Sequence, residues 1–469
     1  MKKYDLIVIG SGPAGEKAAA KAAYFKYKVA IIEKQKKVGG AGVNTGTLPS
    51  KTLKETAVYY SGRNEKGLYG VERVLKDIPS IENFMYREHL VCSDVEHEVL
   101  KNIQNHKIDL FYGSATFQTK NEIRITGLKE DVIWGDYIII ATGSYPYHPS
   151  NIPFDNPRVH DSDSILSINR FPKSLCIIGA GVIGCEYATI FGTMNIDVFL
   201  VNDKKRILTF LDQNISEELV KQMKDIYIDI LFDTKIKSIH VPLHEHQPVN
   251  VEMETGEILH VDMVLYAAGR WGSTEGLGCE KVGIKISDRQ AIIVNDQFQT
   301  SVDNVYAVGD VIGFPALAST SMDQGRVAVS HIFNTKDLDS LPKNFPYGIY
   351  TIPEVSMVGM TEEQAKASNI DYCTGTARYR NSHRGKIKGT TNGFLKIIFR
   401  RKDLVVIGVH IIGEFATELI HFGLTLIENQ QTLLQVVAVV FNYPSLHDLY
   451  KYASYDGLGN LAGHKIREG

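Results

Sequence analysis

The chain has 469 residues and a formal net charge of −3, with 51 lysines and arginines against 54 aspartates and glutamates. This length fits about three domains of ordinary size, and the charge balance does not favour nucleic acid or an anionic membrane as a partner. No apolar run is long enough for a membrane span, and Met1-Lys2-Lys3 leads directly into a strand, so we expect no signal peptide. The cysteines form no CxxC or metal-ligand spacing, which predicts a cytoplasmic protein without a metal site: Cys92, Cys176, Cys185, Cys279 and Cys373.

The first predicted strand, 4–9, runs into the dinucleotide-binding fingerprint Gly10-Ser11-Gly12-Pro13-Ala14-Gly15. An alanine-rich helical stretch follows, as this motif requires. Gly10, Gly12 and Gly15 permit a tight turn and let backbone N–H groups approach a pyrophosphate at the helix N-terminus. The next strand, 29–32, ends at Glu33, where a carboxylate can accept hydrogen bonds from an adenosine ribose.

A hairpin over 123–134, with Gly127 in its turn, precedes an apolar strand that ends in Ala141-Thr142-Gly143. A second fingerprint then follows the strand 175–178, with its glycines at Gly179, Gly181 and Gly184. Two fingerprints predict two bound dinucleotides and hydride transfer between them.

The second copy differs from the first where its next strand, 198–201, ends. Asn202 stands at the position of Glu33, and Asp203, Lys204, Lys205 and Arg206 follow. Because no carboxylate would repel a 2′-phosphate there, and Lys204 and Arg206 are candidate partners for it, we expect both nicotinamide cofactors to be used, with NADPH modestly favoured.

The order of strand signals repeats after the second fingerprint. A hairpin over 251–260 leads into an apolar strand that ends in Ala267-Ala268-Gly269. The sequence therefore predicts an α/β protein with two Rossmann-like dinucleotide-binding domains, one inserted in the other. We expect the first domain to comprise 1–150 and 271–345, and the inserted domain 151–270.

Two segments after the insertion complete this prediction. The strand 300–308 ends in Gly309-Asp310, beside a helix over 321–333. From about Pro346, strands at 394–399 and 405–412 alternate with a helix over 415–429, without a phosphate-binding loop. We interpret 346–469 as an α/β interface domain, and the basic run 378–388 as a solvated strand–loop edge.

These motifs, in this order, resemble the FAD-dependent pyridine nucleotide–disulfide oxidoreductases over nearly the whole chain. The resemblance is carried by five stretches: the fingerprint with Glu33, 39–51, 141–143, 179–186 and 300–310. It implies FAD on the first unit, NADP or NAD on the second, and a C-terminal dimerisation domain, hence a homodimer or a higher homo-oligomer.

The resemblance also assigns roles to individual residues. Lys51 and Glu186 are implied to form a catalytic ion pair beside flavin N5, where a cation stabilises the anionic reduced ring. Asp310 is implied to meet the ribityl hydroxyls of FAD. The remaining implied cofactor contacts lie in the glycine-rich segments: Gly40, Thr142, Gly143 and Gly269.

The chain departs from the family at its redox centre. Gly42 and Thr47 occupy the positions of the two redox cysteines, and Tyr443 occupies the position of the partner subunit's acid–base histidine. A thiol relay needs a thiolate and a proton donor for the leaving sulfur. Disulfide reduction by that route is therefore not expected.

What is left is flavin and nicotinamide chemistry. The branch of the family that the chain then resembles is the soluble pyridine nucleotide transhydrogenases, in stretches such as 145–149, 208–213 and 441–444. We expect hydride transfer between NADPH and NAD⁺ through FAD. Two alternatives stay open: an NAD(P)H:acceptor oxidoreductase that uses a quinone or dye, and a non-catalytic subunit that retains FAD.

Overall fold

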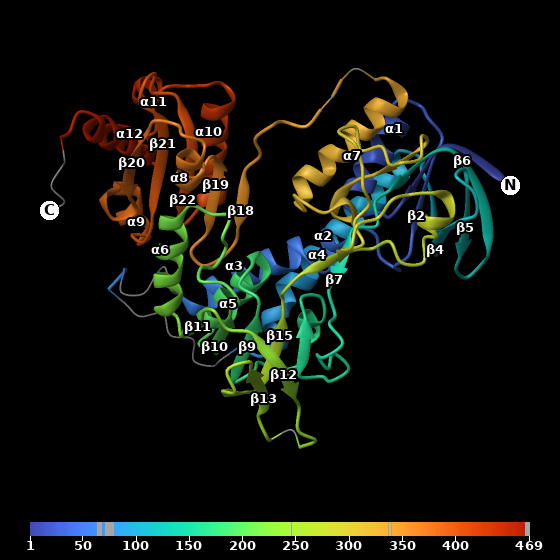
Figure 1. Ribbon diagram of the computed structural model, residues 1–469, viewed down its shortest axis with the longest axis horizontal. Coiled ribbons are helices and arrows are strands. Elements are labelled where there is room, and N and C mark those ends of the chain that lie inside the picture. Colours follow the sequence, from blue (N-terminus) through green and yellow to red (C-terminus); the bar gives the residue numbers. More distant parts are fainter. Residues whose placement is uncertain (63–67, 71–78, 245, 336, 339, 465–469) are drawn as a thin grey trace.

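The computed structural model describes residues 1–62, 68–70, 79–244, 246–335, 337–338 and 340–464. Figure 1 shows three lobes, which carry α1 and α7, the strands β9–β15, and the strands β18–β22. Among the described residues, no helix is both long and apolar enough to cross a membrane.

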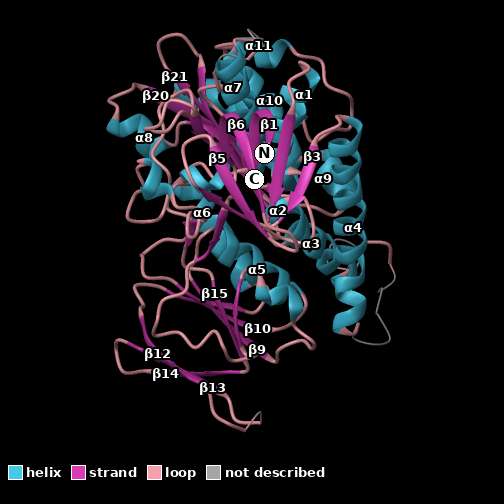
Figure 2. Ribbon diagram, turned by 90° about the vertical axis from the view of Figure 1, so that its right-hand side faces the viewer, coloured by secondary structure: helices cyan, strands magenta, loops and turns pink. Residues whose placement is uncertain are grey.

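The first lobe is built on a sheet of order β3-β2-β1-β6-β5-β4, to which β17 adds by pairing with β6. β1, β2, β3, β6 and β17 run parallel, and β5 and β4 return as an antiparallel meander. The strands are β1 Lys2–Ile9, β2 Val29–Glu33, β3 Asp109–Tyr112, β4 Ser114–Phe117, β5 Glu122–Thr126, β6 Asp131–Ile140 and β17 Val305–Ala307. The helices are α1 Pro13–Tyr24, α2 Gly40–Asn44, α3 Thr47–Ser61, α4 Ile81–Asn105 and α7 Ala318–Phe333, of which α4 stands out at one side of Figure 2.

Both faces of the second half of β1 are buried, which explains its apolar run Leu6-Ile7-Val8-Ile9. Leu6 and Val8 join the core beneath α1, and Ile7 and Ile9 join the core on the opposite face. The small residues of α1 let α7 pack closely, because a Cβ on Gly325 would overlap the Ala14 carbonyl oxygen. One detail differs from the sequence-based expectation: the second arm of the hairpin and the apolar strand after it form a single strand, β6.

The second lobe has a fully parallel sheet of order β11-β10-β9-β15-β8, with a separate antiparallel meander β12-β13-β14. Its elements are β8 Val159–Asp161, β9 Ser174–Ile178, α5 Val182–Thr193, β10 Asp197–Val201, α6 Gln213–Lys224, β11 Ile228–Leu231, β12 Ile236–His240, β13 Val249–Met253, β14 Ile258–Val261 and β15 Met263–Tyr266. Two short antiparallel strands, β7 Ser144–Pro146 and β16 Arg270–Gly272, carry the chain out of the first lobe and back.

The position of β17 confirms the predicted insertion. This strand follows the whole second lobe in the sequence, yet it pairs with β6 and so completes the first sheet. The α/β class with two Rossmann-like units and a third α/β unit is thereby confirmed. The residue numbers at which we divide the units stay predictions.

The C-terminal lobe is an antiparallel sheet of order β18-β19-β22-β21-β20. Its elements are β18 Tyr347–Ile349, β19 Val355–Gly359, α8 Glu362–Ala367, β20 Tyr372–Arg378, α9 His383–Lys388, β21 Phe394–Arg400, β22 Val406–Ile412, α10 Ala416–Glu428, α11 Leu433–Ala438 and α12 Asp448–Leu461. The basic run was predicted as a strand–loop edge, but much of it forms α9, because the Ser382 hydroxyl accepts from the Gly385 N–H and begins a helical turn.

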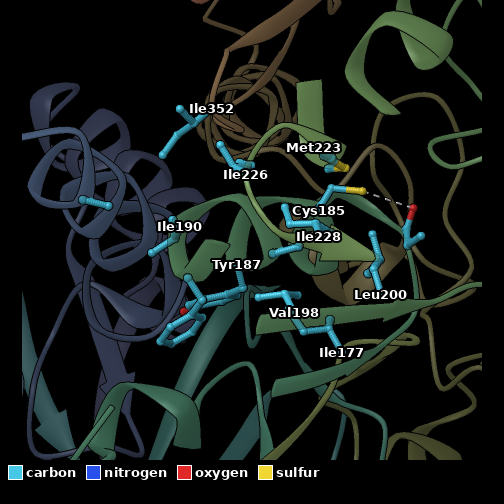
Figure 3. Packing of buried hydrophobic residues seen from close by; sticks show 14 of the residues in the cluster. Ile177, Cys185, Tyr187, Ile190, Val198, Leu200, Met223, Ile226, Ile228 and Ile352 are labelled. Carbon is cyan, nitrogen blue, oxygen red and sulfur yellow. Dashed lines mark hydrogen bonds between the residues drawn. The ribbon is translucent and has the colours of Figure 1, made fainter. Parts of the chain in front are cut away.

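One apolar cluster joins all three lobes. Leu53 comes from α3, Ile190 from α5, and Ile352 from the segment between β18 and β19. Figure 3 shows part of this cluster, with Ile352 near the residues of the second lobe. The lobes are therefore fixed against one another by shared core packing rather than joined by linkers alone.

Candidate functional site

The first fingerprint forms the turn between β1 and α1, and Gly10 and Gly15 in it are sterically required. A Cβ on Gly10, whose φ is +105°, would overlap the Ala141 carbonyl oxygen, and a Cβ on Gly15 would overlap the Gly10 carbonyl oxygen. Gly12, the N-cap of α1, has ordinary clearance, with Gly40 Cα at 3.8 Å from a Cβ built there. The turn thus presents the N-terminus of α1 without side chains in front of it.

Glu33 is buried at the end of β2 and holds this turn in place. Its Oε2 accepts hydrogen bonds from the Ser11 N–H (2.9 Å) and the Ser11 hydroxyl (2.6 Å), and its Oε1 accepts from the Gln35 N–H (2.8 Å). A carboxylate has about four acceptor positions, so it retains capacity for a ribose hydroxyl. The ribose contact stays a prediction.

The segment in which the family carries its redox cysteines, and this chain has Gly42 and Thr47, folds as α2 and the start of α3. A Cβ on Gly40, with φ +55°, would lie 2.7 Å from Gly12 Cα, so α2 contacts the fingerprint directly. A Cβ on Gly42 would lie 2.7 Å from Pro13 Cγ. Neither Gly42 nor Thr47 supplies sulfur, so the structure has no dithiol where the family keeps one.

All five cysteines are buried and unpaired. Burial raises the pKa of Cys92 and Cys176 to about 12 and that of Cys279 to about 11. Burial and the neighbouring Glu186 charge raise the pKa of Cys185 further, and its thiol donates to the Ala180 carbonyl oxygen at 3.5 Å (Figure 3). Cys92, Cys176, Cys185 and Cys279 therefore stay thiols at neutral pH and are poor nucleophiles.

Lys51 of α3 and Glu186 of α5 come together across the boundary between the first two lobes. Lys51 Nζ lies 2.8 Å from Glu186 Oε1 and 2.7 Å from Oε2. The carboxylate side chain is 4% exposed and the lysine side chain 24% exposed, so the pair is fixed from the glutamate side and open from the lysine side. This is the geometry of a cation held ready for a negatively charged group.

Tyr350, which the sequence analysis did not single out, completes this pair. Its backbone N–H donates to Glu186 Oε1 at 2.9 Å, and Lys51 Nζ lies 5.0 Å from the centre of its ring. The Ser50 hydroxyl donates to Glu186 Oε2 at 3.3 Å. Tyr350 follows β18 in the C-terminal lobe, so three lobes build this one cluster; no local sequence pattern announces such a contact.

The Ala-Thr-Gly segment and Asp310 meet at one edge of the first sheet. The Ser144 hydroxyl donates to Asp310 Oδ2 at 3.1 Å, and the Thr142 hydroxyl donates to the Ser273 carbonyl oxygen at 2.7 Å. Gly143, with φ +71°, has nothing within 4 Å of a Cβ position, so this stretch leaves open space. Gly309 lies near α1, with Ala14 Cβ 3.1 Å from a Cβ built on it, which places Asp310 beside the first fingerprint.

The second fingerprint repeats the turn of the first between β9 and α5. A Cβ on Gly184 would overlap the Gly179 carbonyl oxygen, and a Cβ on Gly179 would lie 2.8 Å from the Ala267 carbonyl oxygen. Gly181 and Gly269 have nothing within 4 Å of their Cβ positions. A cavity opens here, with about 450 Å³ of empty space, lined by Pro146, Ser162, Val182, Ile183, Tyr266, Ala267, Gly269 and Arg270.

Arg270 is a cavity residue that the sequence analysis missed. Its guanidinium donates to the Ser144 hydroxyl (2.9 Å) and carbonyl (2.8 Å) and to the Ser162 hydroxyl (3.1 Å). It thereby fixes the crossing strands between the first two lobes at the edge of the cavity. The only signal in the sequence was its place directly after Gly269.

The loop after β10 carries the residues predicted to read the ribose, and contacts within the protein hold it in place. Asn202 is buried, and its Nδ2 donates to the carbonyl oxygens of Lys204 (2.8 Å) and Arg206 (3.1 Å). Lys204 is exposed. Arg206 has its NH1 3.1 Å from Glu363 Oε1 in α8, and its contact with a 2′-phosphate stays a prediction. This glutamate is remote in sequence, so the pairing could not be foreseen.

Tyr443 lies on the surface of the C-terminal lobe, 71% exposed, with its hydroxyl 2.8 Å from His383 Nδ1. Within the part of the chain that the structure describes, no three His, Cys, Asp or Glu residues gather as a metal site.

Comparisons with known proteins agree with this geometry. The family model described as pyridine nucleotide-disulphide oxidoreductase matches residues 4–325, and its dimerisation-domain model matches 345–454. The chain is 40% identical over 466 residues to the soluble pyridine nucleotide transhydrogenase of Mycobacterium bovis (strain BCG / Pasteur 1173P2), covering 98% of both chains. It is 38% identical over 464 residues to the protein of that name from Serratia proteamaculans (strain 568), covering 98% of this chain and 99% of that protein.

A solved structure extends the likeness. The HOCl-induced flavoprotein disulfide reductase RclA from Escherichia coli superposes with a TM-score of 0.87 at 27% identity, covering 96% of this chain and 99% of that chain.

Proposed function

Because the chain belongs to the pyridine nucleotide-disulphide oxidoreductase family, we propose that it is an FAD-dependent transhydrogenase that passes hydride between NADPH and NAD⁺. The observation that carries the proposal is the lysine–glutamate pair standing intact beside a segment without sulfur: Lys51 Nζ lies 2.7 Å from Glu186 Oε2, while Gly42 and Thr47 hold the cysteine positions. The relatives named as transhydrogenases match over the same full length.

The residues of the first lobe fit FAD. The fingerprint turn places a helix N-terminus for the pyrophosphate, Glu33 retains acceptor capacity for a ribose, and Gly143 has open space at its Cβ position. When bound, FAD supplies a ring that takes up and releases two electrons with a proton. Gly10, Gly12, Gly15, Glu33, Gly40, Thr142, Gly143 and Asp310 are the residues that we assign to holding it.

Lys51 and Glu186 provide the electrostatic stabilisation of the reaction. The ammonium group compensates negative charge that arises on the flavin, and Glu186 fixes its position through two short contacts. Because the pair is preformed, the protein spends no reorganisation on it at the moment of transfer.

The second lobe supplies the nicotinamide nucleotide site. Gly269 and Arg270 lie in the wall of the cavity, and Gly181 leaves open space where a side chain would stand. We assign Gly179, Gly181, Gly184 and Gly269 to holding the nucleotide. The same site would hold the hydride donor NADPH and the hydride acceptor NAD⁺ in turn, one after the other. The chain's contribution is to hold each nicotinamide in one orientation and to exclude water.

The proposal includes assembly and location. We assign the C-terminal lobe to a homodimer interface, since it lacks a phosphate-binding loop and matches the dimerisation-domain model. A cytoplasmic location follows from the cysteine usage, which fits a reducing compartment.

Thio-NAD⁺ reduction by NADPH tests the function. The purified protein should carry one FAD per chain and reduce thio-NAD⁺ with ping-pong kinetics. Under anaerobic NADPH titration the flavin should bleach with an end point of one hydride per FAD, because no dithiol stores a second pair of electrons. Turnover with quinones or dyes alone would favour the acceptor oxidoreductase, and FAD without any turnover would favour the non-catalytic subunit.

A further inference from the structure

The loop that reads the adenosine ribose in the second lobe is closed by its own contacts. Asn202 stands where β10 ends, the position from which Rossmann-like domains contact the 2′ position of the ribose. Its amide donates to the Lys204 and Arg206 carbonyl oxygens, at 2.8 and 3.1 Å. The backbone of Arg206 is therefore in direct contact with the side chain of Asn202, the residue at the ribose position.

The side chain of Arg206 leaves this position for the C-terminal lobe. Its NH1 lies 3.1 Å from Glu363 Oε1, and its NH2 donates to the Thr209 carbonyl oxygen at 2.8 Å. The cation that a 2′-phosphate would attract is thus matched by a carboxylate from another lobe. The two side chains are 28% and 42% exposed, so solvent reaches the pair.

Glu363 is itself held in place. Its Oε1 also accepts from the Gln213 N–H at 3.0 Å, and it lies in the first turn of α8, whose N-cap is Thr361. Next to it, buried Lys396 of β21 binds Asp212 at 2.8 Å and also contacts Glu362. This network joins the second and third lobes and fixes the distance between Arg206 and Glu363. Burial raises the pKa of Glu363, but hydrogen bonds from its own backbone, Thr361 and Arg206 outweigh burial and keep it ionised.

We propose that Glu363 of the C-terminal lobe sets the cofactor selectivity of the second dinucleotide site, by holding the Arg206 guanidinium so that it does not favour a 2′-phosphate. This inference rests on the proposed function, which requires one site to accept both NADPH and NAD⁺. A free arginine at the ribose would hold NADP(H) selectively, whereas an arginine neutralised by Glu363 leaves the two cofactors close in affinity. Glu363 acts through Arg206 and is a positioning residue.

Two nucleotide fragments test this on the FAD-loaded protein. Calorimetry gives the dissociation constants of 2′,5′-ADP and of 5′-AMP, which differ by the 2′-phosphate alone. Glu363→Gln keeps the acceptor for Gln213 and removes the charge. We expect it to tighten 2′,5′-ADP by about three- to tenfold and to leave 5′-AMP within about twofold, since the pair is partly solvated. The gain should shrink as salt is added.

Two further variants separate the causes. Arg206→Ala combined with Glu363→Gln should abolish the gain. Glu130→Gln, which removes an exposed carboxylate paired with Arg124 at 2.7 Å in the first lobe, should change neither constant. An equal change in both fragments, or a gain that persists without Arg206, would overturn the inference while leaving the proposed function intact. If neither fragment binds the wild-type protein, the second site and the proposed function both fail.

Discussion

The two dinucleotide-binding loops have the same glycine pattern, but the residue where the following strand ends differs: it is Glu33 in the first lobe and Asn202 in the second. In the first lobe, Glu33 accepts hydrogen bonds from Ser11 and so ties the strand end to the fingerprint turn. In the second lobe, Asn202 donates to the Lys204 and Arg206 carbonyls and ties the strand end to the loop that follows it. Glu33 thus stabilises the fingerprint turn, whereas Asn202 stabilises the loop that directly follows it.

The two loops also differ in what supports them from outside. The first is supported by elements of its own lobe, with α2 in contact at Gly12 and Gly40. The second leans on the C-terminal lobe through Arg206 and Glu363 and through Asp212 and Lys396. We expect FAD to stay bound at the first site, which its own lobe supports. We expect the nicotinamide nucleotides to exchange at the second site, whose loop contacts the C-terminal lobe.

The strongest way to separate the two sites is to fill their glycines. Gly15→Ala places a Cβ against the Gly10 carbonyl, and Gly184→Ala does the same at Gly179. Overpacking of this kind costs about 1–3 kcal/mol or more, so the affinity of each site for its dinucleotide should fall by about 10- to 100-fold. Gly15→Ala should purify with little FAD. Gly184→Ala should stay yellow, but NADPH should no longer bleach it at ordinary concentrations.

Gly181→Ala is the matched control for this comparison. Apart from its chain neighbours and its own helix, no described residue has an atom within 4 Å of its Cβ position. Melting temperature and FAD content should therefore equal those of the wild type, while NADPH binding weakens because the methyl group would face the pyrophosphate. If Gly181→Ala bound NADPH normally, the second fingerprint would not be a dinucleotide site.

Two lysines one turn apart on α3 sharpen the role of the flavin-side pair. Lys51 pairs with Glu186 and keeps a 24% exposed side chain, whereas Lys54 pairs with Glu354 and is only 8% exposed. Lys54→Met leaves Glu354 buried and unpaired, so it should lower the free energy of unfolding by about 3 kcal/mol without changing flavin reduction. Lys51→Met should lose less stability but slow flavin reduction by roughly 100-fold. Stopped-flow reduction and denaturant titration measure the two effects; an equal slowing by both variants would contradict the assignment.

The difference between Glu33 and Asn202 gives a third, smaller effect. Asn202→Ala removes two hydrogen bonds that close the ribose loop, each worth about 1 kcal/mol. We expect NADPH and NADH to weaken together, by about three- to tenfold, with FAD content unchanged. Steady-state KM values for both cofactors check this. Selective loss of NADPH would mean that Asn202 contacts the 2′-phosphate itself.

The sequence predicted those site residues that lie close together in one βαβ unit. It did not predict those that reach a site from another lobe. Gly10, Gly15 and Glu33 lie within one βαβ unit, so spacing alone predicted their places, and the repeat of the pattern predicted the insertion that β17 completes. Tyr350 and Glu363 reach the sites from the C-terminal lobe, and nothing in their own segments marks such contacts. For the same reason no sequence pattern indicated that Arg206 contacts a carboxylate 157 positions away.

The smallest effect concerns His410, which lies near Asp212 and Lys396 between the second and third lobes. Lowering the pH should lower the free energy of unfolding slightly through this residue. His410 of β22 is fully buried, and burial lowers its pKa despite the Asp212 charge, the hydrogen bond to the Met360 carbonyl oxygen and Glu363; Lys396 lowers it as well. Below about pH 6.5 the unfolded chain binds a proton that the folded chain refuses, so the free energy of unfolding must fall with falling pH, by at most about 1.4 kcal/mol per unit. The loss ends where the folded His410 also takes up a proton. His410→Gln should flatten this slope between pH 6.5 and 5, measured by urea titration at each pH, with His464→Gln in the exposed C-terminal segment as control. Equal slopes in the wild type and His410→Gln would contradict a lowered pKa of His410 in the folded chain.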